Sequence, residues 1–202
     1  KTALVANGEI LSYSKTKQLL SSFDQIIAVD GGLFHCDQMN IEPALIVGDL
    51  DSAPTDLLKK YANVTLLQFP VDKDHSDLEI AIHEMFKRGV DQLTLFAVLG
   101  RRTDHLLYML YLLARFPEKL KVVSESETIF AVQKNQVLDV KPGQTLSLIP
   151  LGVVTGLSTQ GLKWEIKSRR LDKQFMSLSN ICNSSEVSIH FESGDLICCL
   201  QK

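Results

Sequence analysis

Apolar residues in the first part of the chain alternate between short continuous runs and longer segments with helical spacing. The short runs are typical of buried strands and cover residues 2–6, 25–29, 44–47, 64–69 and 92–98. The segments between them predict helices over residues 15–23, 52–61 and 76–88, and a further helix that ends at Arg115 or Phe116. This alternation predicts an α/β domain with a mostly parallel, Rossmann-like sheet and helices on both faces.

The pattern changes after Pro117, where short β-type runs replace the alternation of strand and helix. These runs cover residues 121–123, 128–132, 136–140, 145–149, 186–191 and 196–200, and glycine or proline punctuates them. Such spacing predicts an all-β sandwich of antiparallel strands. We therefore expect two domains, an α/β catalytic domain over residues 1–118 and a β-sandwich domain over residues 119–202, with the boundary near residues 117–121.

Composition indicates which partners the protein is expected to bind and where in the cell it is expected to be. The 202-residue chain has a formal net charge of -3 and 45% hydrophobic residues, so there is no basic surplus suited to nucleic acid. Its longest strongly apolar run, residues 106–114, falls short of the roughly 20 residues needed to cross a bilayer. The N-terminus lacks the layout of a signal peptide, and the four cysteines form no C-x-x-C pair. We expect a cytoplasmic protein that binds neither nucleic acid nor membrane.

Acidic side chains follow four of the five predicted strands of the α/β domain: Asp30, Asp49 with Asp51, Asp74 with Asp77, and Asp104. The carboxyl ends of parallel strands meet at one edge of a sheet, where ligands of open α/β folds bind. Crowded carboxylates repel one another unless a cation lies among them. Because magnesium is usually held by one or two carboxylates together with substrate phosphates, the pattern predicts a magnesium and polyphosphate site.

Each of these residues also has a simpler interpretation. Aspartates after a strand commonly cap helices or hold turns, so Asp49 with Ser52 could cap the helix that follows. Asp77 and Glu79 lie in a first helical turn, where negative charge interacts favourably with the helix dipole. Capping alone explains poorly why acids recur at four strand ends. Lys73 and Arg102 stand among these acids and suit phosphate oxygens, although they could simply balance charge.

Several familiar sites lack their sequence signatures. The chain has no G-x-x-x-x-G-K-[ST] phosphate loop, no G-x-G-x-x-G fingerprint, no H-E-x-x-H zinc motif and no G-x-S-x-G elbow. In the second domain, Trp164 is the chain's only tryptophan and follows Gly161-Leu162-Lys163. An isolated tryptophan in a β domain is usually part of the core, which we take as the expectation for Trp164. The alternative is a stacking face for a heterocycle, favoured further if that ring is cationic.

Six segments of the chain, taken together, are more specific than any one of them: Asp30-Gly31-Gly32, Gly48-Asp49-Leu50-Asp51-Ser52, Lys73-Asp74-His75-Ser76-Asp77-Leu78-Glu79, Gly100-Arg101-Arg102-Thr103-Asp104-His105, Gly161 to Trp164, and Ser179-Asn180. In this order they resemble the thiamin pyrophosphokinase family, whose members transfer the pyrophosphoryl group of ATP to the hydroxyl of thiamin. The resemblance spans both domains. It implies an α/β catalytic domain, a β-sandwich domain and a homodimer in which thiamin lies at the interface, with Trp164 supplied by the opposite subunit.

The resemblance also implies a role for each matching residue. The implied magnesium ligands are Asp49, Asp51 and Asp77, with Asp30 and Asp74 close by. ATP would be bound by Asp30, Gly31, Gly32, Lys73, Arg102 and Asp104. Thiamin would be bound by Trp164, Ser179, Asn180 and Lys73. The catalytic residues would be Asp77, Asp74 and Arg102. The chain departs from the family pattern at Ser76, where Thr is common, and in the segment 171–175, which lacks the Gly usual before the Ser-Asn pair.

Two other functions share parts of this pattern. A haloacid-dehalogenase-like phosphatase also uses aspartates two positions apart after a strand, but its D-x-D-x-[TV] motif needs Thr or Val where this chain has Ala53. A non-catalytic nucleotide or thiamin sensor would keep the same binding residues without turnover. Binding without product formation would distinguish the sensor from the enzyme.

Overall fold

The structure is a computed structural model, and it describes residues 1–48, 55–69 and 74–202. The chain divides into two compact units, of which the first contains Lys1–Tyr108 with Val122–Glu125 and the second contains Met109–Lys121 with Ser126–Lys202. Helix α5 (Thr103–Arg115) and strand β6 (Leu120–Val123) each contribute residues to both units. The functional division expected at residue 118 stays a prediction.

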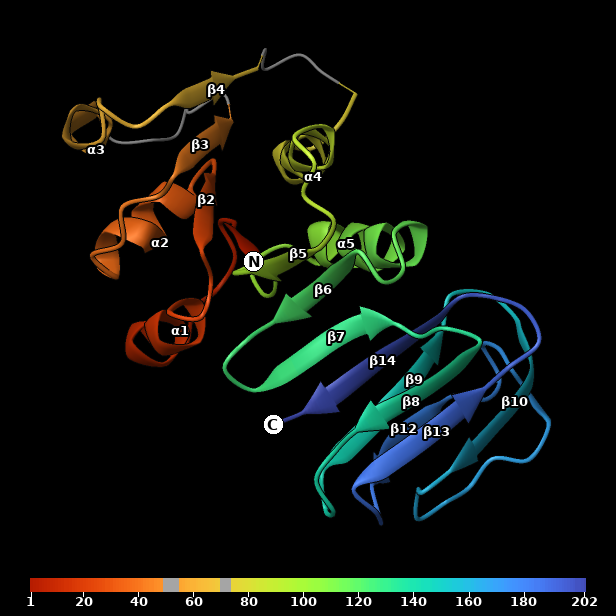
Figure 1. Cartoon of the computed structure of the whole chain (residues 1–202). Coiled ribbons are helices and arrows are strands. Elements are labelled where there is room, and N and C mark those ends of the chain that lie inside the picture. The colour runs from red at the N-terminus through yellow and green to blue at the C-terminus, as the bar shows by residue number, and fades with distance from the viewer. Residues whose placement is uncertain (49–54, 70–73) are drawn as a thin grey trace. The chain divides into compact units, whose positions relative to one another are not determined.

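The first unit is built on a parallel sheet with the strand order β5-β1-β2-β3-β4. Its strands are β1 (Thr2–Val5), β2 (Gln25–Val29), β3 (Leu45–Gly48), β4 (Leu66–Gln68) and β5 (Leu93–Phe96). Its other helices are α1 (Tyr13–Leu20), α2 (Gly32–Gln38), α3 (Thr55–Lys60) and α4 (Asp77–Lys87). Figure 1 shows α1 and α2 on one side of this sheet and α4 on the other.

The apolar runs explain these strands. Every residue of β1, β3 and β5 is buried, as expected for strands of a parallel sheet that is covered on both faces. Helix α4 begins at its N-cap Ser76, whose hydroxyl accepts a hydrogen bond from the Glu79 N–H at 3.2 Å. It buries Ala81, Ile82 and Met85 against the sheet side of the unit. Helix α2 was not expected from the sequence.

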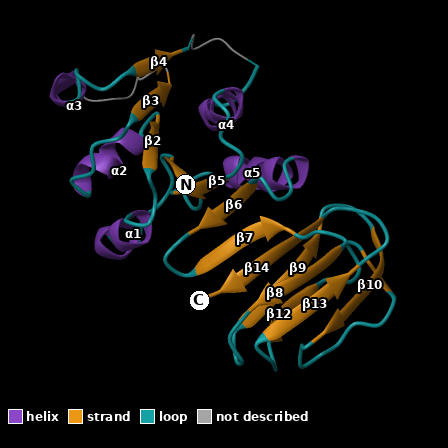
Figure 2. Ribbon diagram, viewed as in Figure 1, coloured by secondary structure: helices purple, strands orange, loops and turns teal. Residues whose placement is uncertain are grey.

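The second unit is a sandwich of two antiparallel sheets, visible as two layers of strands in Figure 2. One layer consists of the neighbouring strands β12-β9-β14-β7, and the other is the separate sheet β11-β10-β13-β8. Its strands are β7 (Glu127–Ala131), β8 (Asn135–Asp139), β9 (Thr145–Pro150), β10 (Val154–Gln160), β11 (Arg169–Leu171), β12 (Ser177–Ile181), β13 (Glu186–His190) and β14 (Leu196–Gln201). Leu146, Leu148, Leu157 and Ile189 belong to the core that both sheets share.

The fold class predicted from the sequence is confirmed: a mostly parallel α/β sheet with helices is followed by an all-β sandwich. Strands β10, β11 and β12 were not expected. In the parts of the chain that the structure describes, no helix is long and apolar enough to span a membrane. All four cysteines are free thiols, and Cys198 is buried whereas its neighbour Cys199 is only partly so.

Two glycines set the distances between strand ends in the first unit. A Cβ at Gly32 would lie 1.9 Å from the carbonyl oxygen of Val5, so α2 starts in direct backbone contact with the end of β1. Gly48 has φ +152°, and a Cβ there would lie 3.1 Å from Cα of Asp30. The ends of β1, β2 and β3 therefore approach more closely than side chains at these positions would allow.

We predict that Gly32→Ala lowers the free energy of unfolding by roughly 2–3 kcal/mol, because the added methyl must displace either α2 or β1. Gly143→Ala is the matched control, since a Cβ at Gly143 meets no atom within 4 Å and only the φ of +89° is unfavourable. That control should lose about 1 kcal/mol. Urea unfolding measures both, and equal losses would contradict the proposed backbone contact.

Candidate functional site

The turn after β2 carries the first of the predicted acidic residues. Asp30 has a φ of +47°, a region that residues other than glycine rarely adopt. Its backbone N–H donates to the Val47 carbonyl at 2.8 Å, and its carbonyl accepts from the Leu33 N–H at 3.1 Å. The turn thus ties the end of β3 to the start of α2. Strained backbone of this kind is concentrated at functional sites, so it supports a functional role for this edge of the sheet.

A second loop at the same edge, residues 7–9 after β1, is fixed from two sides. The Gly8 N–H donates to the Ala97 carbonyl at 2.5 Å, which joins the loop to the end of β5. On the other side, Nε2 of the buried His35 lies 2.9 Å from the Gly8 carbonyl, and the Tyr13 hydroxyl lies 3.0 Å from Nδ1. Because a carbonyl can only accept, Nε2 donates and Nδ1 accepts from Tyr13. Burial lowers the pKa of His35, which favours this neutral form.

The side chain of Asn7 lies where these loops meet. A Cβ at Gly31 would lie 2.3 Å from Cγ of Asn7, and Nη1 of Arg101 lies 3.5 Å from its Oδ1. Arg101 also has a positive φ, of +53°. The structure therefore brings Asn7, Gly31 and Arg101 together from the ends of three strands. Asn7 and His35 were not among the site residues predicted from the sequence.

Arg102 and Asp104, both predicted to contact ATP, form an ion pair with each other. Nε of Arg102 lies 3.1 Å from one carboxylate oxygen of Asp104, and Nη2 lies 2.5 Å from the other. The hydrogen bond from Arg102 is the main reason that the pKa of Asp104 falls to about 2, and Asp104 in turn raises the pKa of Arg102. Both side chains are well exposed. The guanidinium of Arg102 thus stays charged and accessible to solvent, where another anion could replace the Asp104 carboxylate as its partner.

The start of α4 carries the remaining acidic residues that the structure describes. Asp77 is the first residue of the helix, and Asp74 stands three positions before it. Asp49, Asp51 and Lys73 lie outside the described residues. Among the residues that are described, no group of three or more His, Cys, Asp or Glu side chains is arranged to hold a metal ion. The complete predicted ligand set is therefore not assembled from the described residues alone.

Glu79, on the first turn of α4, does not follow its expected role. The sequence interpretation placed it on the helix end as a favourable charge, but it is fully buried. Its Oε2 accepts a hydrogen bond from the hydroxyl of Tyr108 on α5 and lies 3.1 Å from Nδ1 of His75. The sequence did contain a signal, because Glu79 stands three positions before the buried Ile82 and so shares its helix face.

In the second unit, the expectation that Trp164 belongs to the core is wrong, because 55% of the residue is exposed. The ammonium group of Lys163 lies 4.6 Å from the centroid of the indole ring. Asn180 is buried and holds the backbone of this residue: its Oδ1 accepts from the Trp164 N–H at 3.1 Å, and its Nδ2 donates to the Trp164 carbonyl at 2.7 Å. Asn180 thereby fixes where the exposed indole stands.

Strand β12 bulges between Ser177 and Asn180, which changes the side-chain alternation. Leu178 and Ser179 are both exposed, and Ser179 has a φ of +54°. The bulge turns Ser179 outward while Asn180 points into the unit. A pocket of about 540 Å³ lies beside this strand, with Trp164, Arg169, Phe175, Met176, Leu178 and Asn180 among its lining residues. Aromatic and aliphatic walls with a few polar groups are typical of small-molecule sites.

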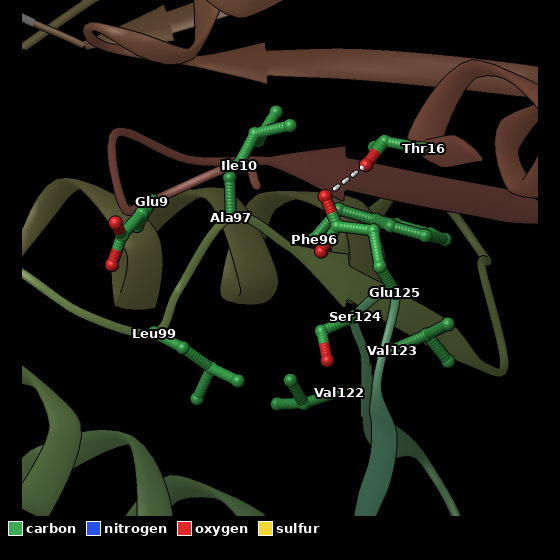
Figure 3. Close-up of a pocket in the computed structure, with 10 residues that line it drawn as sticks. All are labelled: Glu9, Ile10, Thr16, Phe96, Ala97, Leu99, Val122, Val123, Ser124 and Glu125. Atoms are coloured by element: carbon green, nitrogen blue, oxygen red, sulfur yellow. Dashed lines mark hydrogen bonds between the residues drawn. The ribbon is translucent and has the colours of Figure 1, made fainter. Parts of the chain in front are cut away.

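Figure 3 shows a much smaller cavity in the first unit, between Glu9, Phe96 and Ser124. Its volume of about 10 Å³ is enough for roughly one water molecule. The carboxylate of Glu125 at its edge accepts hydrogen bonds from the hydroxyl of Thr16 at 2.8 Å and the N–H of Ser12 at 2.9 Å. This cavity is structural and too small for a substrate.

The fold and these two groups of side chains define a two-domain protein with a polar site at the strand ends of an α/β unit and an aromatic pocket on a β-sandwich unit. The family model for the thiamin pyrophosphokinase catalytic domain matches residues 16–124. The model for the thiamin pyrophosphokinase vitamin B1 binding domain matches residues 127–196. This chain therefore belongs to the thiamin pyrophosphokinase family, and it is an enzyme of thiamin diphosphate synthesis.

Solved structures share this fold over nearly the whole chain. A thiamin pyrophosphokinase family protein from Enterococcus faecalis is 22% identical with a TM-score of 0.87, covering 100% of this chain and 99% of its own. Thiamine pyrophosphokinase from Bacillus subtilis is 20% identical with a TM-score of 0.84, covering 100% and 99%. Thiamin pyrophosphokinase from Candida albicans is 17% identical with a TM-score of 0.86, covering 99% and 88%. Among curated proteins, none matches the sequence significantly.

We predict that Asn180→Ala frees the segment around Trp164. The change removes both hydrogen bonds to Trp164 and a third from the Ile181 N–H. It leaves the Trp164 N–H without its acceptor, which should lower the free energy of unfolding by about 1–3 kcal/mol. Because Trp164 is the only tryptophan, its fluorescence anisotropy and its quenching by acrylamide report on this segment directly. Anisotropy should fall and quenching should rise. Asn183→Ala, at an exposed position nearby, is the control, and identical spectra for the two variants would contradict the role given to Asn180.

Proposed function

We propose that this enzyme transfers the pyrophosphoryl group of ATP to the hydroxyl of thiamin in a magnesium-dependent reaction that gives thiamin diphosphate and AMP. The observation that carries the proposal is the convergence at one edge of the sheet. The turn at Asp30 contacts Gly48, the residue before Asp49, while Asn7, Gly31 and Arg101 meet beside it. The Asp30 turn and the Arg101 guanidinium thus lie at the strand ends, where α/β folds bind their ligands, and this supports the proposal.

The donor chemistry of this edge suits magnesium. All the proposed ligands are carboxylates, which are the hard oxygen donors that magnesium prefers, and magnesium commonly uses only one or two of them with substrate phosphates. Asp49, Asp51 and Asp77 would hold the ion, with Asp30 and Asp74 close by. When bound, the ion would neutralise charge on the phosphate oxygens. Substrate phosphates would complete the coordination of the ion.

Cationic side chains would bind the triphosphate. Arg102 is exposed and its partner Asp104 is equally exposed, so the guanidinium can turn from a carboxylate to a phosphate with the same bidentate geometry. Lys73 would supply a second positive charge. Gly31 and Gly32 would contact ATP through their backbone, since Asn7 and Val5 fill the space beside their Cα atoms. Asp104 would then hold Arg102 in place before ATP arrives. Phosphoryl transfer depends mainly on such positioning and charge stabilisation.

The acceptor would lie on the β-sandwich unit. Trp164 offers an exposed aromatic face, and a thiazolium cation would gain a cation–π interaction by replacing the ammonium group of Lys163. Ser179, turned outward by the bulge in β12, would hydrogen-bond the aminopyrimidine, and Lys73 is the other residue proposed to face thiamin. Asn180 would contribute by holding the backbone of Trp164.

We further propose that the enzyme works as a cytoplasmic homodimer in which Trp164 serves the site of the opposite subunit. Trp164, Met176 and Leu178 are large apolar residues that are unusually exposed around the pocket in this unit. An apolar patch next to a binding pocket is typical of an interface.

The acceptor hydroxyl of thiamin would transfer its proton to Asp77 or Asp74 as it attacks the β-phosphorus and AMP leaves.

Incubation with ATP, magnesium and thiamin should produce thiamin diphosphate and AMP in equal amounts. Asp77→Asn should reduce the rate of thiamin diphosphate formation by at least about 100-fold, because it removes a carboxylate proposed to hold the magnesium that stabilises the transferred group. Asp91→Asn, at an exposed site before β5, is the matched control and should retain the full rate. Chromatography of the nucleotides and thiamin esters measures the ratio of the two products and the rate of each variant.

Release of ADP with thiamin monophosphate would contradict pyrophosphoryl transfer. Tight binding of ATP and thiamin with no product would favour the sensor, and steady release of inorganic phosphate without thiamin would favour the phosphatase.

A further inference from the structure

Glu79 is a buried carboxylate near the start of α4, on a helix whose other buried residues are apolar. It is 0% exposed, and it stands on the same helix as the buried Ala81, Ile82 and Met85. Its backbone N–H donates to the hydroxyl of the N-cap Ser76. A carboxylate removed from water is unfavourable unless hydrogen-bond donors compensate for its lost hydration. The residue therefore needs a reason beyond helix formation.

Two donors from different segments meet this carboxylate. The hydroxyl of Tyr108, on α5, donates to Oε2 of Glu79, and Nδ1 of His75 lies 3.1 Å from the same oxygen. On the opposite side, Nε2 of His83 lies 3.6 Å from Oε1. Glu79 is thus the point at which the segment before α4, the body of α4 and helix α5 are joined within the first unit.

The joined segments are those that carry the proposed chemistry. His75 stands between Asp74 and Asp77, the carboxylates proposed to hold magnesium. Tyr108 stands one helical turn after Asp104, which pairs with Arg102. Contacts through Glu79 therefore connect the proposed metal-binding residues to the helix that begins at the proposed phosphate-binding pair. A buried hydrogen-bonded carboxylate fixes geometry more strictly than an apolar contact would, because each donor has a required direction.

We propose that Glu79 is a positioning residue, which acts through His75 and Tyr108 to hold Asp74 and Asp77 in the arrangement that binds the metal. This inference rests on the proposed function of the strand-end site. Because its side chain is only 1% exposed, we assign Glu79 no direct contact with the metal or the substrate. It contacts His75 in the segment that carries Asp74 and Asp77. Changes to residues that hold metal ligands in place commonly weaken metal binding 10- to 100-fold.

Glu79→Gln and Tyr108→Phe test this role, because each preserves the size of the side chain while altering the hydrogen bond between them. We expect both variants to need about tenfold more magnesium for half-maximal formation of thiamin diphosphate, with most of the maximal rate restored at high magnesium and the KM for thiamin unchanged. Glu84→Gln is the matched control on the same helix, where Glu84 pairs with Arg88 at 3.0 Å near the surface. It should behave as the wild type does.

A merely structural role gives a different result. A lower melting temperature with an unchanged magnesium requirement would overturn the proposal. Should Glu79→Gln fail to fold, Tyr108→Phe carries the test, because it leaves the carboxylate in place.

A direct binding measurement separates this inference from the proposed reaction. Electron paramagnetic resonance of Mn²⁺, titrated into each folded protein with ATP, measures metal affinity without turnover. If the wild type makes no thiamin diphosphate but Mn²⁺ binds about tenfold more weakly to the variants, the positioning role stands and the proposed reaction fails. Equal Mn²⁺ affinity in wild type, Glu79→Gln and Tyr108→Phe would refute the positioning role whatever the reaction.

Discussion

The backbone contact between the start of α2 and the end of β1 is the constraint on which the α/β unit depends. Only a glycine at position 32 permits it, because a Cβ would lie 1.9 Å from the Val5 carbonyl oxygen. The contact draws the Asp30 turn inward, where it bonds to Val47 and lies against Gly48. Three strand ends then meet within a few ångströms. Asn7, Gly31 and Arg101, which follow three of the strands, meet at this edge of the sheet.

Several locally unfavourable features lie at or near this edge of the sheet. Asp30 and Arg101 adopt positive φ values, and Glu79 holds a carboxylate in a buried position. Each feature is unfavourable in isolation, and each is stabilised by specific bonds to neighbouring segments. The β-sandwich unit repeats this arrangement at Ser179, whose positive φ accompanies the bulge that exposes it beside Trp164. Strain and buried polarity therefore coincide with both candidate sites.

Periodicity predicted the α/β and sandwich classes because continuous apolar runs and helical spacing report directly on burial. It missed α2, since a seven-residue helix that starts at Gly32 has neither a capping side chain nor a long repeat. It missed β12 because a bulge breaks the alternation between Leu178 and Ser179. The residue pattern alone favoured a core position for Trp164 because spacing cannot tell which face of a β domain is open, whereas the family resemblance implied a thiamin-binding role. The hydrogen bonds of Glu79 to Tyr108 and of Asn180 to Trp164 could not be predicted from the sequence, since these partners lie 29 and 16 positions away.

The claim that the strand ends form a metal and phosphate site is tested most directly by a crystal structure with Mn²⁺ and a non-transferable ATP analogue. Anomalous scattering locates the ion without ambiguity. The account predicts an Mn²⁺ peak about 2.0–2.3 Å from a carboxylate oxygen of Asp77, with the β- and γ-phosphates completing its coordination. A peak away from the ends of β2, β3 and β4, or a triphosphate bound elsewhere in the molecule, would contradict it.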